Sequence, residues 1–157
     1  MMTTDQFISM VRGAALCNPP TLWNTYQLSR QCLVDGIHGD FVECGVFAGS
    51  QTAVMARALV ENPDHKKKVH LFDSFQGIPE AGPNDDESIT GCIGKGSGQG
   101  RLVSTGVSSC SVEQVKLNMK NWGVPADLMV YHPGWFQHTV PVWGGEVISL
   151  LRLDGDL

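Results

Sequence analysis

The stretch FVECGVFAGSQT, residues 41–52, decides the fold. Residues 41–45 are mostly apolar or small around one glutamate, which is typical of a short buried strand. Two glycines follow, four residues apart, and end that strand. The next segment, SQTAVMARALVE over 50–61, is rich in alanine and predicts a helix with Ser50 as its N-cap. A strand that passes through glycines into a helix favours an α/β fold.

Strands and helices alternate along the rest of the chain. The spacing of apolar residues predicts helices over 4–16 and over 21–36, with Thr21 capping the second, and Ser111 is predicted to cap another. Short apolar runs predict three further strands, at 69–72, 128–132 and 147–153. This alternation predicts a parallel sheet. The last run, VISLLRL, is almost wholly apolar, so both of its faces are expected to be buried.

Residues 76–109 form a long connection that contains six glycines between 91 and 106. A connection of this length inside a compact domain is usually either a functional lid or a disordered segment. Its acidic cluster, Asp85, Asp86 and Glu87, fits a solvated loop, and the alternative is that a lid uses it to meet a substrate.

The composition excludes several classes of protein. Of the 157 residues 42% are hydrophobic and 17% charged, as in a globular domain, and the net charge of −5 argues against nucleic-acid binding. The five cysteines are odd in number and include no C-x-x-C, which argues against a zinc site or a disulfide framework. No signal peptide or membrane span is visible. We therefore expect a cytoplasmic protein with no membrane partner.

The distinctive polar and glycine residues follow the carboxyl ends of the predicted strands, where open parallel sheets bind ligands. They are Glu43 to Gly49, Asp73 to Phe75, Pro133 to Phe136, and Asp154 to Asp156. This coincidence predicts a single site at one edge of the sheet.

The first of these segments has features of a nucleoside site. Gly45 and Gly49 would let the backbone approach a ligand, and the helix that starts at Ser50 would favour a carboxylate or phosphate. Asp73 can accept hydrogen bonds from a ribose diol. A tight turn beside a surface aspartate is the alternative. The dinucleotide pattern G-x-G-x-x-G is absent, because Phe47 replaces its second glycine, and GCIGKGSG fails as a phosphate-binding P-loop.

The pattern E-x-G-x-x-x-G with an acid ending the second strand resembles class I S-adenosylmethionine-dependent methyltransferases. GDFVECGVFAGSQT, LFDSFQGIP, SVEQVKLNM, HPGWF and LLRLDGDL occur in the order and spacing of the macrocin O-methyltransferase (TylF-like) family, over about residues 37–157. The resemblance implies S-adenosyl-L-methionine and Mg²⁺ as cofactors. It also implies a small-molecule hydroxyl acceptor, on a sugar-containing natural product or a glycan precursor.

The resemblance also implies roles for particular residues. Asp154 would bind Mg²⁺ and act as the general base for the acceptor hydroxyl. The other implied residues are cofactor-binding: Glu43 and Gly45 flank the methionine part, Asp73 and Ser74 lie at the ribose, and Gly134 and Trp135 line the adenine. Cys44, Gly49 and Ser50 complete the predicted cofactor-binding residues. Trp135 and Phe136 are equally well explained as core aromatics, Asp156 as a helix cap, and His132 and His138 as structural or surface residues.

The family's sheet has the strand order 3-2-1-4-5-7-6, so the resemblance implies that strands 3-2-1-4 are present and strands 5–7 are missing. Residues 1–36 would be N-terminal helices on the substrate side, and 37–157 a partial cofactor-binding domain with the lid at 76–109. Two hypotheses follow: a Mg²⁺-dependent sugar O-methyltransferase, and a cofactor-binding or interaction fragment without turnover. An exposed fourth strand would allow a homo-oligomer. A nucleotide-sugar or NAD enzyme is a more distant third.

Overall fold

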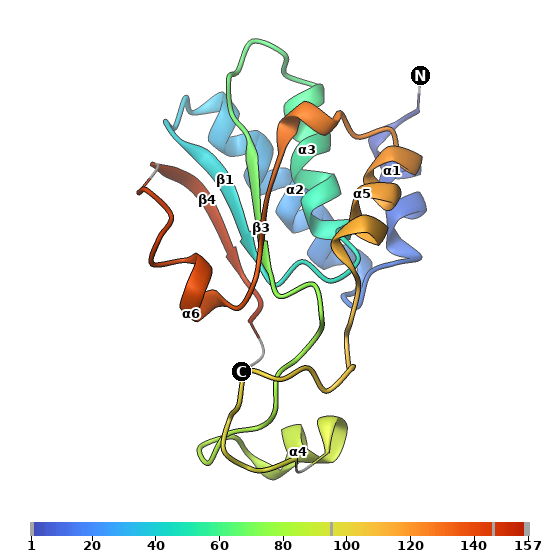
Figure 1. The fold of residues 1–157 in the computed structure, drawn as a ribbon. Helices are drawn as coiled ribbons and strands as arrows, with labels where there is room; N and C mark the ends of the chain where they lie inside the picture. The colour runs from blue at the N-terminus through green and yellow to red at the C-terminus, as the bar shows by residue number, and fades with distance from the viewer. Residues whose placement is uncertain (1, 95, 146, 156–157) are drawn as a thin grey trace.

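The computed structural model describes residues 2–94, 96–145 and 147–155, and Lys95 and Asp156 lie outside them. Its centre is a four-stranded sheet in the order β3-β2-β1-β4, in which every neighbouring pair is parallel (Figure 1). The predicted fold class and strand order are therefore confirmed. The strands are Asp40–Cys44 (β1), Val69–Asp73 (β2), Met129–Pro133 (β3) and Ile148–Leu153 (β4).

Helices cover the two faces of the sheet unequally in the described part of the chain. Helices α1, α2, α3 and α5 lie on one side of the sheet, and the short α6 lies on the other (Figure 1). The helices are Thr4–Arg12 (α1), Pro19–Val34 (α2), Ser50–Val60 (α3), Glu87–Ile93 (α4), Val112–Asn121 (α5) and Phe136–Thr139 (α6), with a 3-10 turn at Ala126–Leu128 (η1). None of the described helices is long and apolar enough to cross a membrane.

The face under α1, α2, α3 and α5 holds most of the buried core. Phe41 of β1 and Leu71 of β2 are fully buried there, and they belong to one cluster with Val54 and Leu59 of α3. Side chains alternate between the two faces of a strand, so this face receives every second residue of each strand. Burial of these large side chains is the main stabilising contribution to the sheet.

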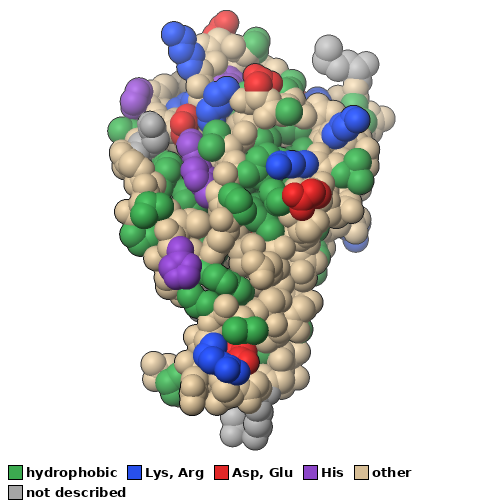
Figure 2. Space-filling view, in the orientation of Figure 1, with side chains coloured by type: hydrophobic (Ala, Val, Ile, Leu, Met, Phe, Trp, Pro, Cys, Tyr) green, Lys and Arg blue, Asp and Glu red, His purple; other side chains and the backbone are tan. Residues whose placement is uncertain are grey.

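The opposite face has a much smaller core. Val42, Cys44 and Phe72 are buried there against Phe136 and Trp143. Leu151 and Leu153 of β4 pair in register with Val42 and Cys44, yet they remain 47% and 70% exposed. Figure 2 shows hydrophobic side chains reaching the surface beside histidines on the viewed side of the molecule. The expectation that both faces of the last strand are buried is wrong here, because an apolar strand is buried only where another element covers it.

The helix caps follow the predictions in one case out of three. Ser111 caps α5 by accepting a hydrogen bond from the Gln114 amide, as expected. Asn18, not Thr21, caps α2, because the two prolines after Asn18 suit the first helical positions. Gly49 occupies the N-cap of α3, while the Ser50 hydroxyl donates to the Val11 carbonyl at 2.8 Å. The Thr21 and Ser50 predictions are therefore wrong.

Residues 76–109 form a lobe that extends from the sheet and contains α4 (Figure 1). The lobe is more regular than expected, because an antiparallel bridge joins Pro79 to Ser104. Arg101 donates two hydrogen bonds of 2.9 Å to the Glu80 carboxylate across it. In the acidic cluster, Asp85 accepts a hydrogen bond from the Gly82 amide. The base of this lobe lies next to the carboxyl ends of the strands.

Candidate functional site

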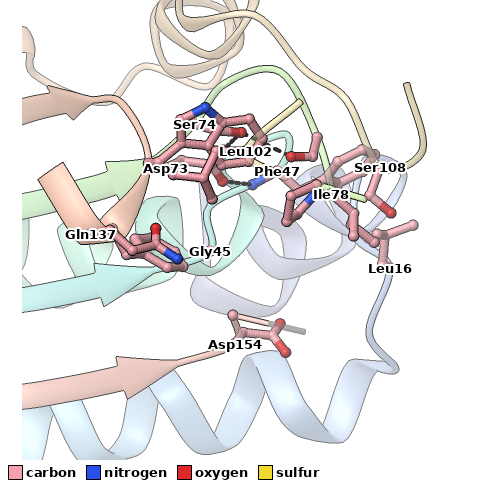
Figure 3. Close-up of a pocket in the computed structure, with 15 residues that line it drawn as sticks. Leu16, Gly45, Phe47, Asp73, Ser74, Ile78, Leu102, Ser108, Gln137 and Asp154 are labelled. Carbon is pink, nitrogen blue, oxygen red and sulfur yellow. Dashed lines mark hydrogen bonds between the residues drawn. The ribbon is translucent and has the colours of Figure 1, made fainter. Parts of the chain in front are cut away.

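A pocket lies at the carboxyl ends of β1, β2 and β4, where the sequence predicted a site (Figure 3). It holds about 700 Å³ of empty space, part of it open to solvent. Among the described residues that line it, Asp73 and Asp154 are the charged ones, and neither lysine, arginine nor histidine is present. In Figure 3 the two carboxylates stand on opposite sides of the pocket, with Gly45 and Gln137 between them.

The rest of the wall is mostly apolar and comes from distant parts of the chain. Phe47 follows β1, and Trp135 and Phe136 follow β3. Ile78 and Leu102 come from the lobe, and Leu16 comes from the connection between α1 and α2. An apolar concave wall with two fixed polar groups is typical of a small-molecule site.

Asp73 organises the loops on one side of the pocket. Its Oδ2 accepts hydrogen bonds from the amides of Val46 (2.6 Å) and Phe47 (3.1 Å), and its Oδ1 accepts one from the Phe75 amide (2.6 Å). Phe47 and Phe75 have φ values of 50° and 54°, a region that costs a non-glycine residue of order 1–3 kcal/mol. One carboxylate thus holds two strained turns, and its Oδ1 also accepts a longer hydrogen bond, of 3.5 Å, from the Ser74 hydroxyl.

The two glycines of the opening stretch are required by neighbouring protein atoms. Gly45 has a φ of 87°, and a Cβ there would overlap the carbonyl oxygen of Asp154. Gly49 has a φ of 91°, and a Cβ there would lie 2.5 Å from the Met119 Cε of α5. The sequence correctly predicted that other atoms approach the backbone closely at these two glycines. The approaching atoms belong to the protein itself: the Asp154 carbonyl just after β4, and Met119 of α5.

Glu43 lies beneath the pocket in a network of buried charges. It is 0% exposed, it accepts a hydrogen bond from the Thr52 hydroxyl, and its Oε1 accepts one from Arg152 Nη1 at 2.9 Å. Burial raises the pKa of Glu43 to about 7, while Arg152 and Thr52 oppose that shift. Arg152 Nη2 also donates to Asp154 Oδ2 at 2.6 Å. The guanidinium thus joins the buried carboxylate to the one at the pocket.

The pocket brings together half of the predicted site residues. Those that line it are Gly45, Asp73, Ser74, Trp135 and Asp154. Those outside its lining are Glu43, Cys44, Gly49, Ser50 and Gly134. Of these, Cys44 packs against Phe72 on the second face, where burial raises the pKa of its thiol. The binding role of every residue in both groups stays a prediction.

Several lining residues were missed by the sequence analysis as site residues. Ile78, Leu102 and Leu16 carry no local signal, because nothing in their own segments indicates that the lobe and the α1–α2 connection meet at the sheet edge. Arg152 had a usable signal, since it is the one charged residue in the apolar run 147–153.

The histidines do not reach this pocket. His132 Nε2 lies 2.9 Å from His70 Nδ1, and His70 Nε2 lies 3.1 Å from Asp40 Oδ2. Burial, together with His70, lowers the pKa of His132. His138 sits in the last turn of α6. This placement agrees with the structural interpretation of His132.

The described residues do not form a magnesium site. No group of three or more acidic, histidine or cysteine side chains in the described ranges could hold a metal ion. Asp73 and Asp154 are the carboxylates of the described lining, but both oxygens of Asp73 accept backbone hydrogen bonds, and Asp154 Oδ2 accepts one from Arg152. Mg²⁺ normally takes one or two carboxylates and completes its shell with other oxygens. We therefore assign no step to a metal.

Comparison with known proteins identifies the family. The model of the macrocin O-methyltransferase (TylF) family matches residues 19–157. The chain is 35% identical over 126 residues to 8-demethyl-8-(2,3-dimethoxy-alpha-L-rhamnosyl)-tetracenomycin-C 4'-O-methyltransferase of Streptomyces olivaceus, which covers 80% of this chain and 45% of that protein. It is 31% identical over 135 residues to demethyldecarbamoylnovobiocin O-methyltransferase of Streptomyces niveus, covering 82% and 48%. The chain spans about half the length of the curated relatives it matches.

Solved structures agree with this assignment. The O-methyltransferase NovP matches with a TM-score of 0.77 and 27% identity over 92% of this chain and 57% of NovP. The calicheamicin methyltransferase CalS11 matches with a TM-score of 0.61 and 22% identity over 99% of this chain and 56% of CalS11, which supports the fold alone. The family resemblance predicted from the motifs is confirmed: the chain belongs to the macrocin O-methyltransferase (TylF) family.

Proposed function

We propose that the pocket binds S-adenosyl-L-methionine as the donor for methylation of a hydroxyl on a sugar-containing natural product. The charge of the lining carries this proposal, because Asp73 and Asp154 are carboxylates and the described lining offers no cationic side chain. Such a wall suits a sulfonium cation and disfavours the phosphates of NAD or a nucleotide sugar. Phe47, Trp135 and Phe136 add aromatic surface, which attracts cations and stacks on a base. The relatives' names supply the acceptor class.

The placement of the residues suggests how the ligand would be divided between them. Asp73 would bind the ribose hydroxyls through Oδ1, where the hydrogen bond from Ser74 is long at 3.5 Å, and Trp135 would contact the adenine. Asp154 would face the reacting centre, because its side chain is 55% exposed at the other side of the pocket. Its free oxygen would take the proton of the acceptor hydroxyl as the methyl group moves in line. In this assignment Glu43 acts from beneath the pocket and does not touch the cofactor.

Mg²⁺ dependence and turnover by this chain remain predictions. Asp154 is the candidate ligand for a cation such as Mg²⁺, because both oxygens of Asp73, the other carboxylate of the described lining, already accept backbone hydrogen bonds. The alternative function is a module that binds the cofactor without turnover. Both functions need the cofactor pocket, which is formed by described residues of this chain. Methyl transfer measured with and without Mg²⁺ separates the two functions.

Calorimetric titration tests the shared part of both functions. S-adenosylmethionine, S-adenosylhomocysteine and NAD are titrated into the folded chain, and we expect saturable binding of the first two only. Asp154→Asn should weaken S-adenosylmethionine more than S-adenosylhomocysteine, because the latter lacks the positive charge. Asp127→Asn, an exposed residue in η1 at the opposite edge of the sheet, is the matched control. Absence of binding by a folded chain refutes the proposal.

A further inference from the structure

Arg152 is the one basic side chain that connects the interior of the sheet to the pocket in the described structure. It pairs in register with Glu43 on the neighbouring strand, so both side chains point to the same face. Asp154 directly follows β4, two residues after Arg152, and its carboxylate lies within hydrogen-bond distance of the same guanidinium. Nη1 donates to Glu43 at 2.9 Å and Nη2 donates to Asp154 at 2.6 Å, so two separate nitrogens hold two separate carboxylates.

The two carboxylates differ in freedom. Glu43 is 0% exposed and is also held by Thr52 of α3, so it provides a fixed anchor for the guanidinium. Asp154 is 55% exposed, and its Oδ1 has no hydrogen-bond partner among the described residues. A planar guanidinium with a fixed anchor imposes a direction on the second carboxylate that it binds. The Glu43–Arg152–Asp154 bridge therefore orients one oxygen of Asp154 beside the pocket, and among residues 2–94, 96–145 and 147–155 no side chain or amide pairs with that oxygen.

The charges of the bridge reinforce this arrangement. Arg152 carries one positive charge between two carboxylates, and its side chain is only 19% exposed. When Glu43 is ionised the three groups keep a net negative charge, and Asp154 is the one of the three that lines the pocket. A guanidinium without the buried anchor would neutralise Asp154 more completely, and the pocket would then prefer a cation less strongly.

We propose that Arg152 is a positioning residue, anchored by Glu43, that aims Asp154 at the positive centre of the methyl donor. This inference rests on the proposed function for the identity of the ligand. It adds a residue that the family resemblance did not assign. Its consequence is that the Glu43–Arg152 pair sets how strongly the pocket distinguishes the cationic donor from its neutral product, S-adenosylhomocysteine.

A purely structural ion pair is the competing explanation, and two variants separate it. Removing Arg152 alone leaves a buried carboxylate without its counter-charge, which destabilises the fold. The double variant Glu43→Gln/Arg152→Gln removes both groups and leaves Asp154 without its anchor, and it keeps the net charge of the site when measured at a pH well above 7, where Glu43 is ionised. Urea unfolding and circular dichroism establish that the double variant is folded before any ligand is added.

The first measurement needs no ligand. In the wild-type chain the ¹⁵N-labelled guanidinium of Arg152 should give resolved, slowly rotating Nη–H signals, because both nitrogens are held. Asp154→Asn should shift the Nη2 signals and leave the Nη1 signals nearly in place. A freely averaging Arg152 guanidinium in the folded wild type overturns the bridge, and with it the inference, whatever the pocket binds.

The second measurement is the ratio of the affinities for S-adenosylmethionine and S-adenosylhomocysteine. Loss of a well-placed charge contact should lower this ratio about fivefold in Asp154→Asn, and by a comparable factor in Glu43→Gln/Arg152→Gln. The triple variant should show no further decrease beyond Asp154→Asn, because the pair acts through Asp154.

Each other outcome overturns the inference. Equal weakening of both ligands by the double variant means a structural role, and a decrease that persists beside Asp154→Asn means that the pair acts by another route. A folded wild type that binds neither ligand refutes the proposed function and the pocket role of Arg152 together, while the guanidinium spectrum still shows whether the bridge exists.

Discussion

The two sides of the pocket use the same residue type for different purposes. On the β2 side, Asp73 accepts three backbone hydrogen bonds and holds loops from two strands. On the β4 side, Asp154 is 55% exposed and makes one ion pair, to Arg152. Both aspartates end a strand or directly follow one, and both line the same cavity. The difference teaches that position at a strand end predicts which side chains line the pocket, while burial and hydrogen-bond partners decide whether such a side chain is locked to the backbone or left partly exposed.

The largest expected effect tests this contrast directly. Asp73→Ala should lower the free energy of unfolding by about 3 kcal/mol, because hydrogen bonds to a charged group contribute about 1.5–3 kcal/mol each and are not additive. Asp154→Ala should cost only about 0–1 kcal/mol, as expected for an exposed ion pair. Urea denaturation of both variants measures the difference. Equal costs would remove the distinction between the two sides.

This contrast also affects ligand experiments. Since Asp73 holds the turns at Phe47 and Phe75, loss of binding in Asp73→Ala would report collapse of the loops as well as loss of a ribose contact. Asp154→Asn is the cleaner probe, because the side chain of Asp154 holds no loop in the described structure.

A smaller effect is expected at Gly45, where the two sides meet. Gly45→Ala would place a methyl group against the Asp154 carbonyl and force an alanine to a φ of 87°. We expect a destabilisation of about 2 kcal/mol from overpacking and backbone strain. Gly36→Ala has a positive φ of 62° but open space around it, and it serves as the control for strain alone. A decrease in melting temperature no larger than that of Gly36→Ala would show that the Asp154 backbone does not restrict the space at Gly45.

The remaining expected effect is a pH dependence of stability from the buried Glu43. Burial raises the pKa of Glu43 from 4.5 to about 7, so the folded chain binds this proton more tightly than the unfolded chain does. The contribution of Glu43 to stability is therefore full below about pH 4.5, and it is lost as the pH rises through about 7. Glu43→Gln should flatten the decline in stability over that window. Glu113→Gln, an exposed residue on α5, should leave the decline unchanged, and a wild type without any such decline would contradict the assignment.

The sequence predicted the helices and strands better than it predicted which residues of different segments contact one another. Alternating helices and apolar runs were sufficient for the class of fold, and the motifs led to the strand order and the family. The clamp of Asp73 on Val46 and Phe47 could not be predicted, because it joins residues 27 and 26 positions apart through the chance geometry of two loops. The N-cap prediction at Ser50 failed because the Ser50 hydroxyl donates a hydrogen bond to the carbonyl of Val11, which belongs to another helix.

The sequence by itself determined the parallel α/β architecture, the edge of the sheet where the site lies, and membership of the family. Those features depend on local periodicity and on residues at fixed spacing along the chain. The tertiary structure alone decided that Asp73 is a scaffold, that Glu43 lies under the pocket, and that Arg152 connects it to Asp154. Glu43 and Arg152 are 109 residues apart, and only the pairing of β1 with β4 brings them to 2.9 Å. Contacts of that kind depend on strand order and burial, which no single segment encodes.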